Sequence, residues 1–302
     1  MKELLINIGW ESVECLLCHS ETKARPIFVK NKPLVNGQFG YAVHPVICQC
    51  GLVYLSPRWS KKDYDIFYQQ YYDELYRLEI KPDYGKSGVI AHMETIWLRI
   101  KNIVREINVN NILDIGCGFG YGLKYLQKQL PNTQLFGIEA SKDCCQKIQS
   151  KEIGATLISS DFDSEWVINY KNSMDLIILR HVVQHMLNPV ETLSKIRETL
   201  TSNGLIYIST LNMMCPRVKL RDYKNWWEYY YRIPHTYYFS KETLFKVLEK
   251  ANLYPLIYEK NDAEEVWCLA TTDKSKQACI SDSNIYEKQI KILKRYLGPQ
   301  EA

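Results

Sequence analysis

The residues best suited to chemistry form a turn in which glycine occupies every second position. A short apolar run, residues 111–115, carries Asp114 next to its end, and Gly116, Gly118 and Gly120 follow. Glycine has no side chain that would keep a ligand away from the backbone, and the amides at the start of the next helix would face that ligand. The pattern predicts a strand, a tight turn and a helix that bind a cofactor containing adenosine.

Acidic residues at the ends of the next two predicted strands extend this cofactor site. Glu139 ends the second strand, where a carboxylate can accept hydrogen bonds from both hydroxyls of a ribose. Asp161 follows the third strand and can accept a hydrogen bond from an adenine amino group, although Asp163 competes for this role. An acid that binds ribose serves NAD and S-adenosylmethionine equally, so the choice between them depends on later residues.

The fourth predicted strand leads into a turn that contains two histidines. Residues 174–179 are apolar apart from Asp175, and His181, His185 and Pro189 follow. Open α/β sheets bind their ligands at the carboxyl ends of the strands, so either imidazole could act on a bound substrate. Packing within the core is the alternative role for both histidines.

Four cysteines near the N-terminus are spaced like metal ligands. The pairs are Cys15 with Cys18 and Cys48 with Cys50. Four thiolates would hold a structural zinc ion tetrahedrally, in a module too small for a large core. The second pair is tighter than usual, so His19 or His44 is a possible substitute ligand. Four reduced cysteines that bind no metal are the other alternative.

Composition indicates a globular protein with a mild positive charge. The chain has 302 residues, 46% of them apolar and 24% charged, and a net charge of +4. The sequence contains no run of about 18 apolar residues, so it does not predict a membrane span. Ten cysteines, and a start without the basic-then-apolar order of a secretion signal, predict a reducing compartment, by default the cytoplasm. The charge does not indicate nucleic acid, and the sequence gives no oligomeric state.

Strand-like and helix-like segments alternate after residue 110, which predicts an α/β fold. Strands are expected at 111–115, 134–138, 156–159, 174–179, 204–210, 255–260 and 265–271. This alternation predicts a seven-stranded Rossmann-like sheet with helices on both faces and an antiparallel hairpin at one edge. The expected domains are a small zinc-ribbon-like module at 1–60, a helical linker or cover at 61–108, the α/β domain at 109–272 with an insertion at 215–239, and a helical tail at 273–302.

The insertion after the fifth strand is rich in aromatic residues. Nine of the seventeen residues from 223 to 239 are aromatic. The segment would overhang the strand ends, where aromatic rings can stack on sugars or planar substrates. A hydrophobic cover that only closes the cofactor pocket is the alternative. We predict substrate contacts from Trp226, Trp227, Tyr230, Arg232 and Tyr237.

Taken in order, these features resemble class I S-adenosylmethionine-dependent methyltransferases, and the resemblance spans residues 90–272. The shared pattern is the D-x-G-x-G-x-G strand end, the acids after strands two and three, and the two histidines and proline after strand four. The resemblance implies that Gly116 and Gly118 lie beneath the methionine portion of the cofactor, while Asp114 orients its amino group. It further implies that Glu139 holds the ribose and Asp161 the adenine amine.

The N-terminal module extends the resemblance. The phrase from Cys50 to Arg58, followed by a tyrosine-rich segment, is similar to the zinc-ribbon-bearing methyltransferases of sugar, polysaccharide and secondary-metabolite pathways. This chain departs from them by His19, where a glycine is usual, and by one residue fewer in the second cysteine pair. The resemblance implies structural zinc and a sugar, glycan or small-metabolite acceptor.

Residues 232–240 resemble the E-H-x-x-y-f-S phrase of the same family, in whose sugar C-methylating members a Tyr, a Glu and the His surround the reacting carbon. Here His235 is kept and Pro234 replaces the Glu. We therefore expect O-methylation with His235 as general base, or else His185 or His181. N- or C-methylation of a sugar or small molecule is one alternative. RNA methylation is another, disfavoured because residues 1–60 carry only six Lys and Arg against four Asp and Glu.

Overall fold

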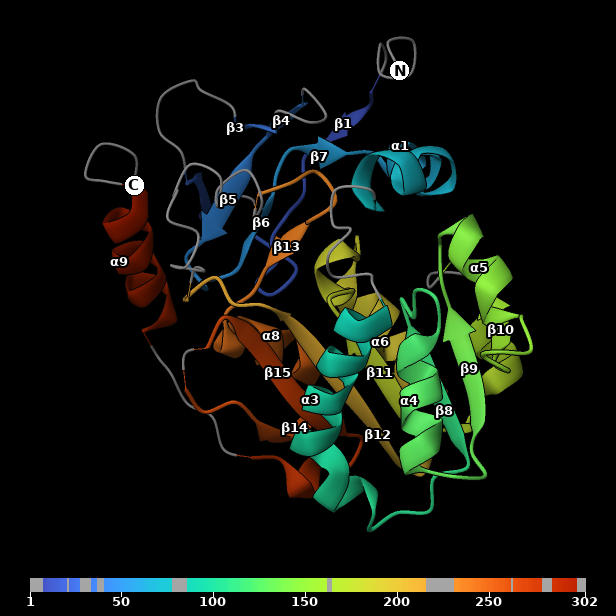
Figure 1. Cartoon of the computed structure of the whole chain (residues 1–302). Coiled ribbons are helices and arrows are strands. Elements are labelled where there is room, and N and C mark those ends of the chain that lie inside the picture. Colours follow the sequence, from blue (N-terminus) through green and yellow to red (C-terminus); the bar gives the residue numbers. More distant parts are fainter. Residues whose placement is uncertain are drawn as a thin grey trace.

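The apolar segments predicted as strands form one seven-stranded sheet in the computed structural model (Figure 1). Its strands are β8 (Asn111–Ile115), β9 (Gln134–Ile138), β10 (Thr156–Ser159), β11 (Met174–Arg180), β12 (Leu200–Leu211), β14 (Tyr254–Tyr258) and β15 (Glu265–Thr271). Their order is β10-β9-β8-β11-β12-β15-β14, with parallel pairing from β10 to β12. β15 is antiparallel to both β12 and β14, which confirms the predicted fold and its edge hairpin.

The structure describes residues 8–20, 22–27, 34–36, 41–77, 86–161, 165–215, 231–261, 263–278 and 284–297. No helix in these ranges is long and apolar enough to cross a membrane. The predicted substrate residues Trp226, Trp227 and Tyr230 lie outside the described residues, as does Asp163.

Successive side chains of the central strands enter two different cores. Ile112 of β8 packs in a core shared with α3 and α4, whereas Leu113 packs in a core shared with α6 and α8. The two-residue period of a strand produces this alternation. The helices are α3 (Lys86–Val104), α4 (Tyr121–Gln129), α5 (Lys142–Ile148), α6 (Pro189–Arg197) and α8 (Lys241–Lys250). In Figure 1, α3 and α4 lie in front of the sheet.

Polar caps fix the start of three helices that follow site segments, α5, α6 and α8. Ser141 caps α5 just after Glu139, and Asn188 caps α6 a few residues beyond the histidine turn. Ser240 opens α8 with a capping box that includes Thr243. A capping side chain satisfies backbone amides that the first turn of a helix leaves without partners, so these residues hold the carboxyl-edge loops in place.

The N-terminal residues form a small β module followed by an aromatic helical segment. Its elements are β1 (Trp10–Glu11), β2 (Ala24–Pro26), β3 (Leu34–Asn36), β4 (Tyr41–Val43), β5 (Pro45–Cys48), β6 (Val53–Leu55), β7 (Arg58–Trp59), α1 (Lys61–Ile66) and the π-helical η1 (Phe67–Arg77). Tyr64 and Phe67 are buried beside Trp59, with ring centroids 5.7 and 6.0 Å from the indole. The aromatic face therefore packs against the protein itself.

A strand from the second half of the chain joins this module. β13 (Tyr237–Tyr238) pairs antiparallel with β6, so the module's main sheet has the order β13-β6-β5-β2. Tyr64 donates a hydrogen bond from its hydroxyl to the carbonyl of Ile233 at 2.8 Å. The segment that carries His235 thus has the N-terminal module as one wall.

The last described helix, α9 (Ile285–Leu297), packs on the same module (Figure 1). Ile285 and Leu293 are buried, and a Cβ on Gly51 would come within 2.7 Å of Ile285 Cγ2. The guanidinium of Arg25 lies 5.3 Å from the ring centroid of Tyr286. Segments from both ends of the chain are therefore in contact. The domain boundaries expected at residues 60, 108 and 272 stay predictions.

Candidate functional site

The glycine turn has the backbone conformation that its sequence predicts. Gly116, Gly118 and Gly120 have φ values of +76°, +55° and +76°, in the left-handed region that favours glycine. A Cβ on Gly116 would come within 2.7 Å of Val182 Cγ2, whereas a Cβ on Gly118 would meet no atom within 4 Å. The backbone at Gly118 is therefore open on the side where a ligand would lie.

Glu139 holds this turn from the neighbouring strand. Its carboxylate accepts hydrogen bonds from the backbone amide of Gly118 at 2.8 Å and from that of Ser141 at 2.9 Å. The side chain is buried, with 7% exposure. Each carboxylate oxygen has more than one lone pair. Glu139 can therefore keep these bonds and still accept hydrogen bonds from ribose hydroxyls.

Asp114 lies buried at the end of β8, beside the glycine turn. Burial, followed by the nearby negative charge of Glu139, raises the pKa of Asp114 to about 8, and Arg180 opposes part of this shift. At neutral pH this carboxyl group therefore holds a proton when no cation is bound close to it. A cationic amino group placed against Asp114 would favour the ionised form.

Asp161 is exposed in the loop after β10. Its backbone amide donates a hydrogen bond to Ser159 Oγ at 3.0 Å, and that hydroxyl donates to the carbonyl of Asp161 at 2.8 Å. The Glu139 amide donates to the carbonyl of Ser159 at 3.2 Å, so the two acids leave the same sheet edge. The role of Asp161 at the adenine stays a prediction.

The histidine turn lies next to the glycine turn. His181 has a φ of +52°, and its backbone amide donates to the carbonyl of Ser209 in β12 at 2.9 Å. Its neighbour Val182 is the residue that closes over Gly116. The Val182 side chain thus lies between the predicted catalytic turn and the predicted cofactor residues, so the two turns are neighbours.

His185 and His235 form an aromatic pair. Their ring centroids are 5.0 Å apart in a T-shaped arrangement. His185 Nδ1 donates to the carbonyl of Pro234 at 2.8 Å, and the Tyr68 hydroxyl is 3.3 Å from the same nitrogen. Burial lowers the pKa of His185 to about 4, so this ring is neutral at pH 7 and a weak base. His235 itself is buried, with 5% exposure.

A charged network that the sequence analysis missed lies on the other side of His181. His181 Nε2 is 3.3 Å from Glu265 Oε1, and Arg99 donates to Glu265 Oε2 at 2.6 Å. Arg99 also donates to the Tyr207 hydroxyl at 2.6 Å, and its guanidinium lies 4.8 Å from the ring centroid of Trp267. No motif marks these residues, because α3, β12 and β15 bring them together from distant parts of the chain.

The two predicted substrate residues within the described ranges are both buried. Tyr237 has 2% exposure, and its ring stacks 6.1 Å from Phe239 where the module meets the α/β domain. Arg232 has 7% exposure, and its carbonyl accepts a hydrogen bond from the His235 amide at 3.0 Å. In this arrangement Tyr237 and the Arg232 backbone support the histidine segment.

The four predicted metal ligands converge in the N-terminal module. The Sγ atoms of Cys15, Cys18, Cys48 and Cys50 all lie within 4.8 Å of one another. Zinc–sulfur bonds of about 2.3 Å place tetrahedral thiolates at comparable separations. Burial, and then hydrogen bonds and charge from neighbouring thiols, raise the pKa of Cys48 to about 11. A zinc ion would compensate the charge that four thiolates bring together.

The two histidines considered as substitute ligands lie outside this cluster. His19 is exposed and has its Nδ1 3.3 Å from Glu14 Oε1. The ring of His44 packs edge-on against Trp10, with centroids 5.9 Å apart. Among the described residues, the cluster consists of the four cysteines alone. The tight C-x-C spacing therefore still allows four sulfurs to converge.

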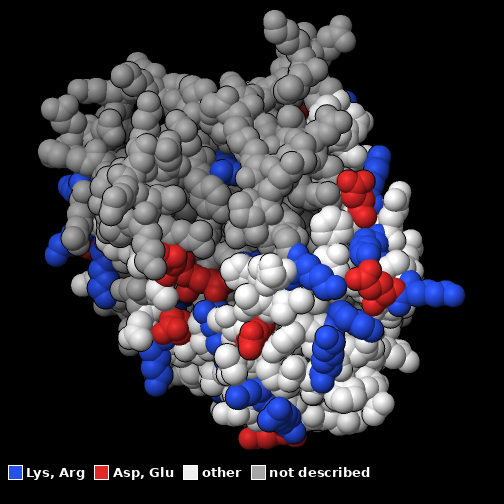
Figure 2. All heavy atoms as spheres, in the orientation of Figure 1, with Lys and Arg blue, Asp and Glu red and all other residues white. Residues whose placement is uncertain are grey.

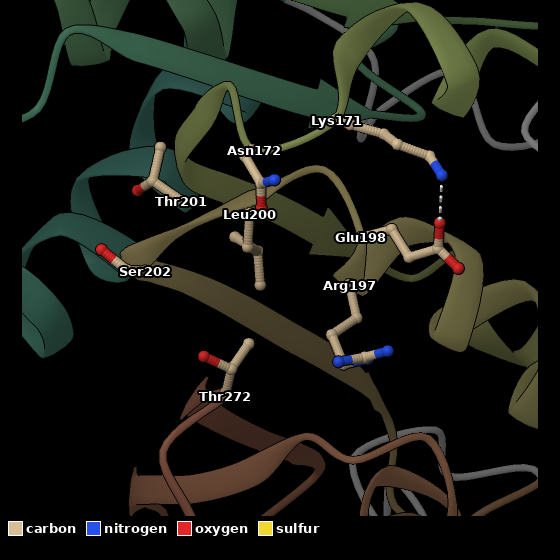
Figure 3. Close-up of a pocket in the computed structure, with 8 residues that line it drawn as sticks. All are labelled: Lys171, Asn172, Arg197, Glu198, Leu200, Thr201, Ser202 and Thr272. Carbon is tan, nitrogen blue, oxygen red and sulfur yellow. Dashed lines mark ion pairs between the residues drawn. The ribbon is translucent and has the colours of Figure 1, made fainter.

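A cavity of about 610 Å³ lies at the opposite edge of the sheet (Figure 3). Its lining comes from the loop before β11, the end of α6, the amino end of β12 and Thr272 after β15. Lys171 pairs with Glu198 at 3.3 Å on one side of this cavity (Figure 3). Because the glycine turn and the histidines are at the carboxyl edge, this cavity is separate from the predicted cofactor site.

Known proteins share this fold. Residues 89–256 match a family described as a methyltransferase domain. A crystal structure of the plantazolicin methyltransferase BpumL, with S-adenosylhomocysteine bound, has the same fold at a TM-score of 0.51 and 18% identity, covering 77% of this chain and 89% of that one. The family match spans more than half of the chain. The chain therefore belongs to the methyltransferase domain family.

Curated relatives agree with this class. Malonyl-(acyl-carrier protein) O-methyltransferase of Halalkalibacterium halodurans is 30% identical over 33% of this chain and 38% of that protein. The tRNA U34 carboxymethyltransferase of Desulfotalea psychrophila is 28% identical over 39% and 37%. Ubiquinone biosynthesis O-methyltransferase of Cereibacter sphaeroides is 25% identical over 54% and 69%. The chain spans less than two fifths of the length of the first two relatives.

Proposed function

We propose that this protein is an S-adenosylmethionine-dependent methyltransferase that acts on a hydroxyl oxygen of a sugar, a glycan or a small metabolite, with a histidine at the carboxyl edge of the sheet as general base. The observation that carries the proposal is the contact between the two turns: Val182 lies over Gly116, directly after His181. S-adenosylmethionine supplies an electrophilic methyl group at this edge. A hydroxyl acceptor needs a base to take its proton as the new bond forms.

The residues at the edge fit the cofactor. Gly118 leaves its backbone open, which suits the methionine portion, and Glu139 is held by two amides in a position to accept from ribose hydroxyls. Asp114 is the buried carboxyl that would face the cofactor's amino group. We assign the adenine amine to Asp161, as the sequence predicts.

The histidine segment supports oxygen over carbon as the acceptor atom. The carbonyl of Pro234, at the position where sugar C-methylating relatives have a Glu, accepts a hydrogen bond from His185. Pro234 provides no carboxylate there, so the candidate bases beside it are the imidazoles of His185 and His235. Two of the curated relatives are O-methyltransferases by name, which agrees with this choice.

We further propose that the four cysteines hold a structural zinc ion, and that the predicted insertion at 215–239 covers the acceptor. The cluster has sulfur ligands on all four positions of a tetrahedral ion, which leaves none for a substrate. The charge distribution also supports a small acceptor. Figure 2 shows Lys and Arg interspersed with Asp and Glu over the described part of one face, without the clustered basic surface that RNA binding favours.

The transferred atom can be identified with S-adenosylmethionine labelled with carbon-13 in its methyl group. The protein is incubated with matched acceptors that carry a hydroxyl, an amine or a methyl ether at the same position. We expect a labelled methyl ether from the hydroxyl acceptor alone, recognised by its carbon chemical shift. Label on nitrogen or carbon would contradict the O-methyltransferase proposal. In a parallel reaction with RNA, label in the RNA would favour the RNA alternative. The affinity of the protein for RNA should then fall steeply with salt.

The three histidines are then compared as alanine variants at saturating cofactor. Loss of the base should lower kcat roughly 100-fold or more while S-adenosylhomocysteine still binds. A His235→Ala variant that retains nearly full turnover and normal cofactor binding would remove His235 from the catalytic role that its sequence context predicts. The same criterion applies to His185 and His181.

A further inference from the structure

We propose that Glu265 is a positioning residue that, braced by Arg99, orients His181 as the general base of the reaction. This inference rests on the proposed function, because it names the histidine that takes the acceptor proton. Each side chain of the network is about a quarter exposed: 24% for His181, 22% for Glu265 and 23% for Arg99. The network is therefore held by the protein but reaches the surface of the edge.

The first argument is the tautomer of His181. A carboxylate only accepts hydrogen bonds, so the imidazole nitrogen 3.3 Å from Glu265 must be the one that carries hydrogen. That nitrogen is Nε2. In the neutral ring the lone pair is therefore on Nδ1, which becomes the basic atom. A carboxylate that fixes an imidazole in this way also stabilises the cation formed when the base takes a proton.

The second argument is that Glu265 remains a carboxylate although it is largely enclosed. Burial alone would raise its pKa, but hydrogen bonds from His181 and Arg99, together with the charge of Arg99 and that of His181 once it is protonated, outweigh that effect and hold the pKa of Glu265 well below its usual range. Arg99 occupies Oε2 and leaves Oε1 for His181. The Tyr207 hydroxyl and the Trp267 ring hold the guanidinium in turn.

The third argument is position. His181 follows β11, Glu265 begins β15 opposite Leu211, and the His181 amide bonds to Ser209 in β12. Three strands therefore fix the pair at the edge where Val182 meets the glycine turn. His181 has a φ of +52°, in the left-handed region that residues other than glycine seldom adopt. The surrounding structure must impose this conformation, which aims the ring at Glu265.

Two further titratable or charged groups lie near His181. Arg180 precedes it in the chain, and His185 on the next turn is close enough for the two imidazoles to repel each other when charged. His185 is neutral at pH 7, so it does not oppose the charge of Glu265 at that pH. By contrast, His185 Nδ1 donates to a backbone carbonyl and not to a carboxylate, and burial lowers the pKa of this ring to about 4, which makes His185 the weaker base.

Nitrogen NMR on protein labelled at its histidines tests the pair without any acceptor. The chain has six histidines, and the signal lost in His181→Ala identifies the one of interest. We expect hydrogen on Nε2 of the neutral ring, and a pKa for His181 that falls by about one unit or more in Glu265→Gln. Arg99→Met, which leaves the carboxylate with His181 as its charged partner, should raise that pKa.

Opposite responses of the two variants are the readout that a merely structural role would not produce. A His181 pKa unchanged in Glu265→Gln, or hydrogen on Nδ1 of the neutral wild-type ring, would overturn the proposal. Thermal melting of each variant shows whether it is folded. With a hydroxyl acceptor in hand, Glu265→Gln should lower kcat about 10-fold or more at neutral pH and leave KM for the cofactor unchanged. Absence of methyl transfer by the wild type would count against the proposed function but not against the pair.

Discussion

At the scale of single residues, the protonation of Asp114 links the cofactor to pH. Its pKa in the folded chain is about 8, against about 3.9 for an unfolded aspartate. The folded state therefore binds a proton that the unfolded state releases between these values. The contribution of this group to stability is complete below the unfolded pKa and is lost as the pH rises through the folded pKa.

Cofactor binding should therefore release a proton from Asp114. The amino group of S-adenosylhomocysteine is cationic at pH 7, and placing it beside the carboxyl favours the ionised form. Calorimetric titrations at pH 7, in two buffers of different ionisation enthalpy, should give different heats. The Asp114→Asn variant, which has no proton to lose there, is the control and should give equal heats. Equal heats for the wild type would show that the amino group is not placed against Asp114.

At the scale of the element, two glycines allow the effect of a substitution on folding to be separated from its effect on cofactor binding. Gly118 and Gly154 both have positive φ values, +55° and +68°, and a Cβ on either would meet no atom within 4 Å. Alanine should cost about 1–2 kcal/mol of folding free energy at each site, because both need a left-handed backbone. Only Gly118 lies in the predicted cofactor turn.

We expect Gly118→Ala to weaken S-adenosylhomocysteine binding by about 10-fold or more, since the added methyl group occupies the open side of the turn. Gly154→Ala should lose similar stability and bind normally. Chemical unfolding and calorimetry measure the two quantities on the same samples. Equal affinities for the two variants would mean that the ligand does not lie against Gly118.

The strands could be predicted from the sequence wherever local pattern decides the structure. The runs at 111–115, 134–138, 156–159 and 265–271 have the predicted bounds, because each is an apolar segment enclosed by turn residues. β12 begins four residues before the predicted strand, since Leu200 already pairs with Met174. β13 is two residues long and pairs with β6 across most of the chain, so no local pattern could indicate it.

The same reasoning separates the parts of the candidate site. Glu139 and the glycines could be located in advance because they occupy strand ends, which the pattern of apolar residues determines. Glu265 also lies at a strand end, but its importance comes from Arg99 on α3 and His181 after β11. Those contacts depend on how helices and strands pack, and one sequence contains no periodic signal for them.

At the scale of the whole molecule, the cysteine module supports the carboxyl edge of the sheet directly. The amide of Leu55 in β6 donates to the carbonyl of Thr236 at 3.0 Å, and Arg58 donates to the carbonyl of Leu187 at 2.8 Å. Thr236 follows His235, and Leu187 comes two residues after His185. Loosening the module should therefore disturb the packing of His185 and His235 as well as the fold of the module itself.

We expect one zinc ion per chain, and a single unfolding transition that shifts as a whole when the ion is removed. Losing about 3 kcal/mol of the binding free energy of a structural zinc would lower the melting temperature by about 6–12 °C. Cys48→Ser should reproduce this shift and move the NMR signals of His185 and His235, whereas Cys215→Ser, a half-buried thiol outside the cluster, should do neither. Elemental analysis and scanning calorimetry provide the measurements. Two separate transitions after zinc removal, with the signals of His185 and His235 unchanged, would contradict this expectation. The module and the carboxyl edge of the sheet would then unfold independently despite the pairing of β6 with β13.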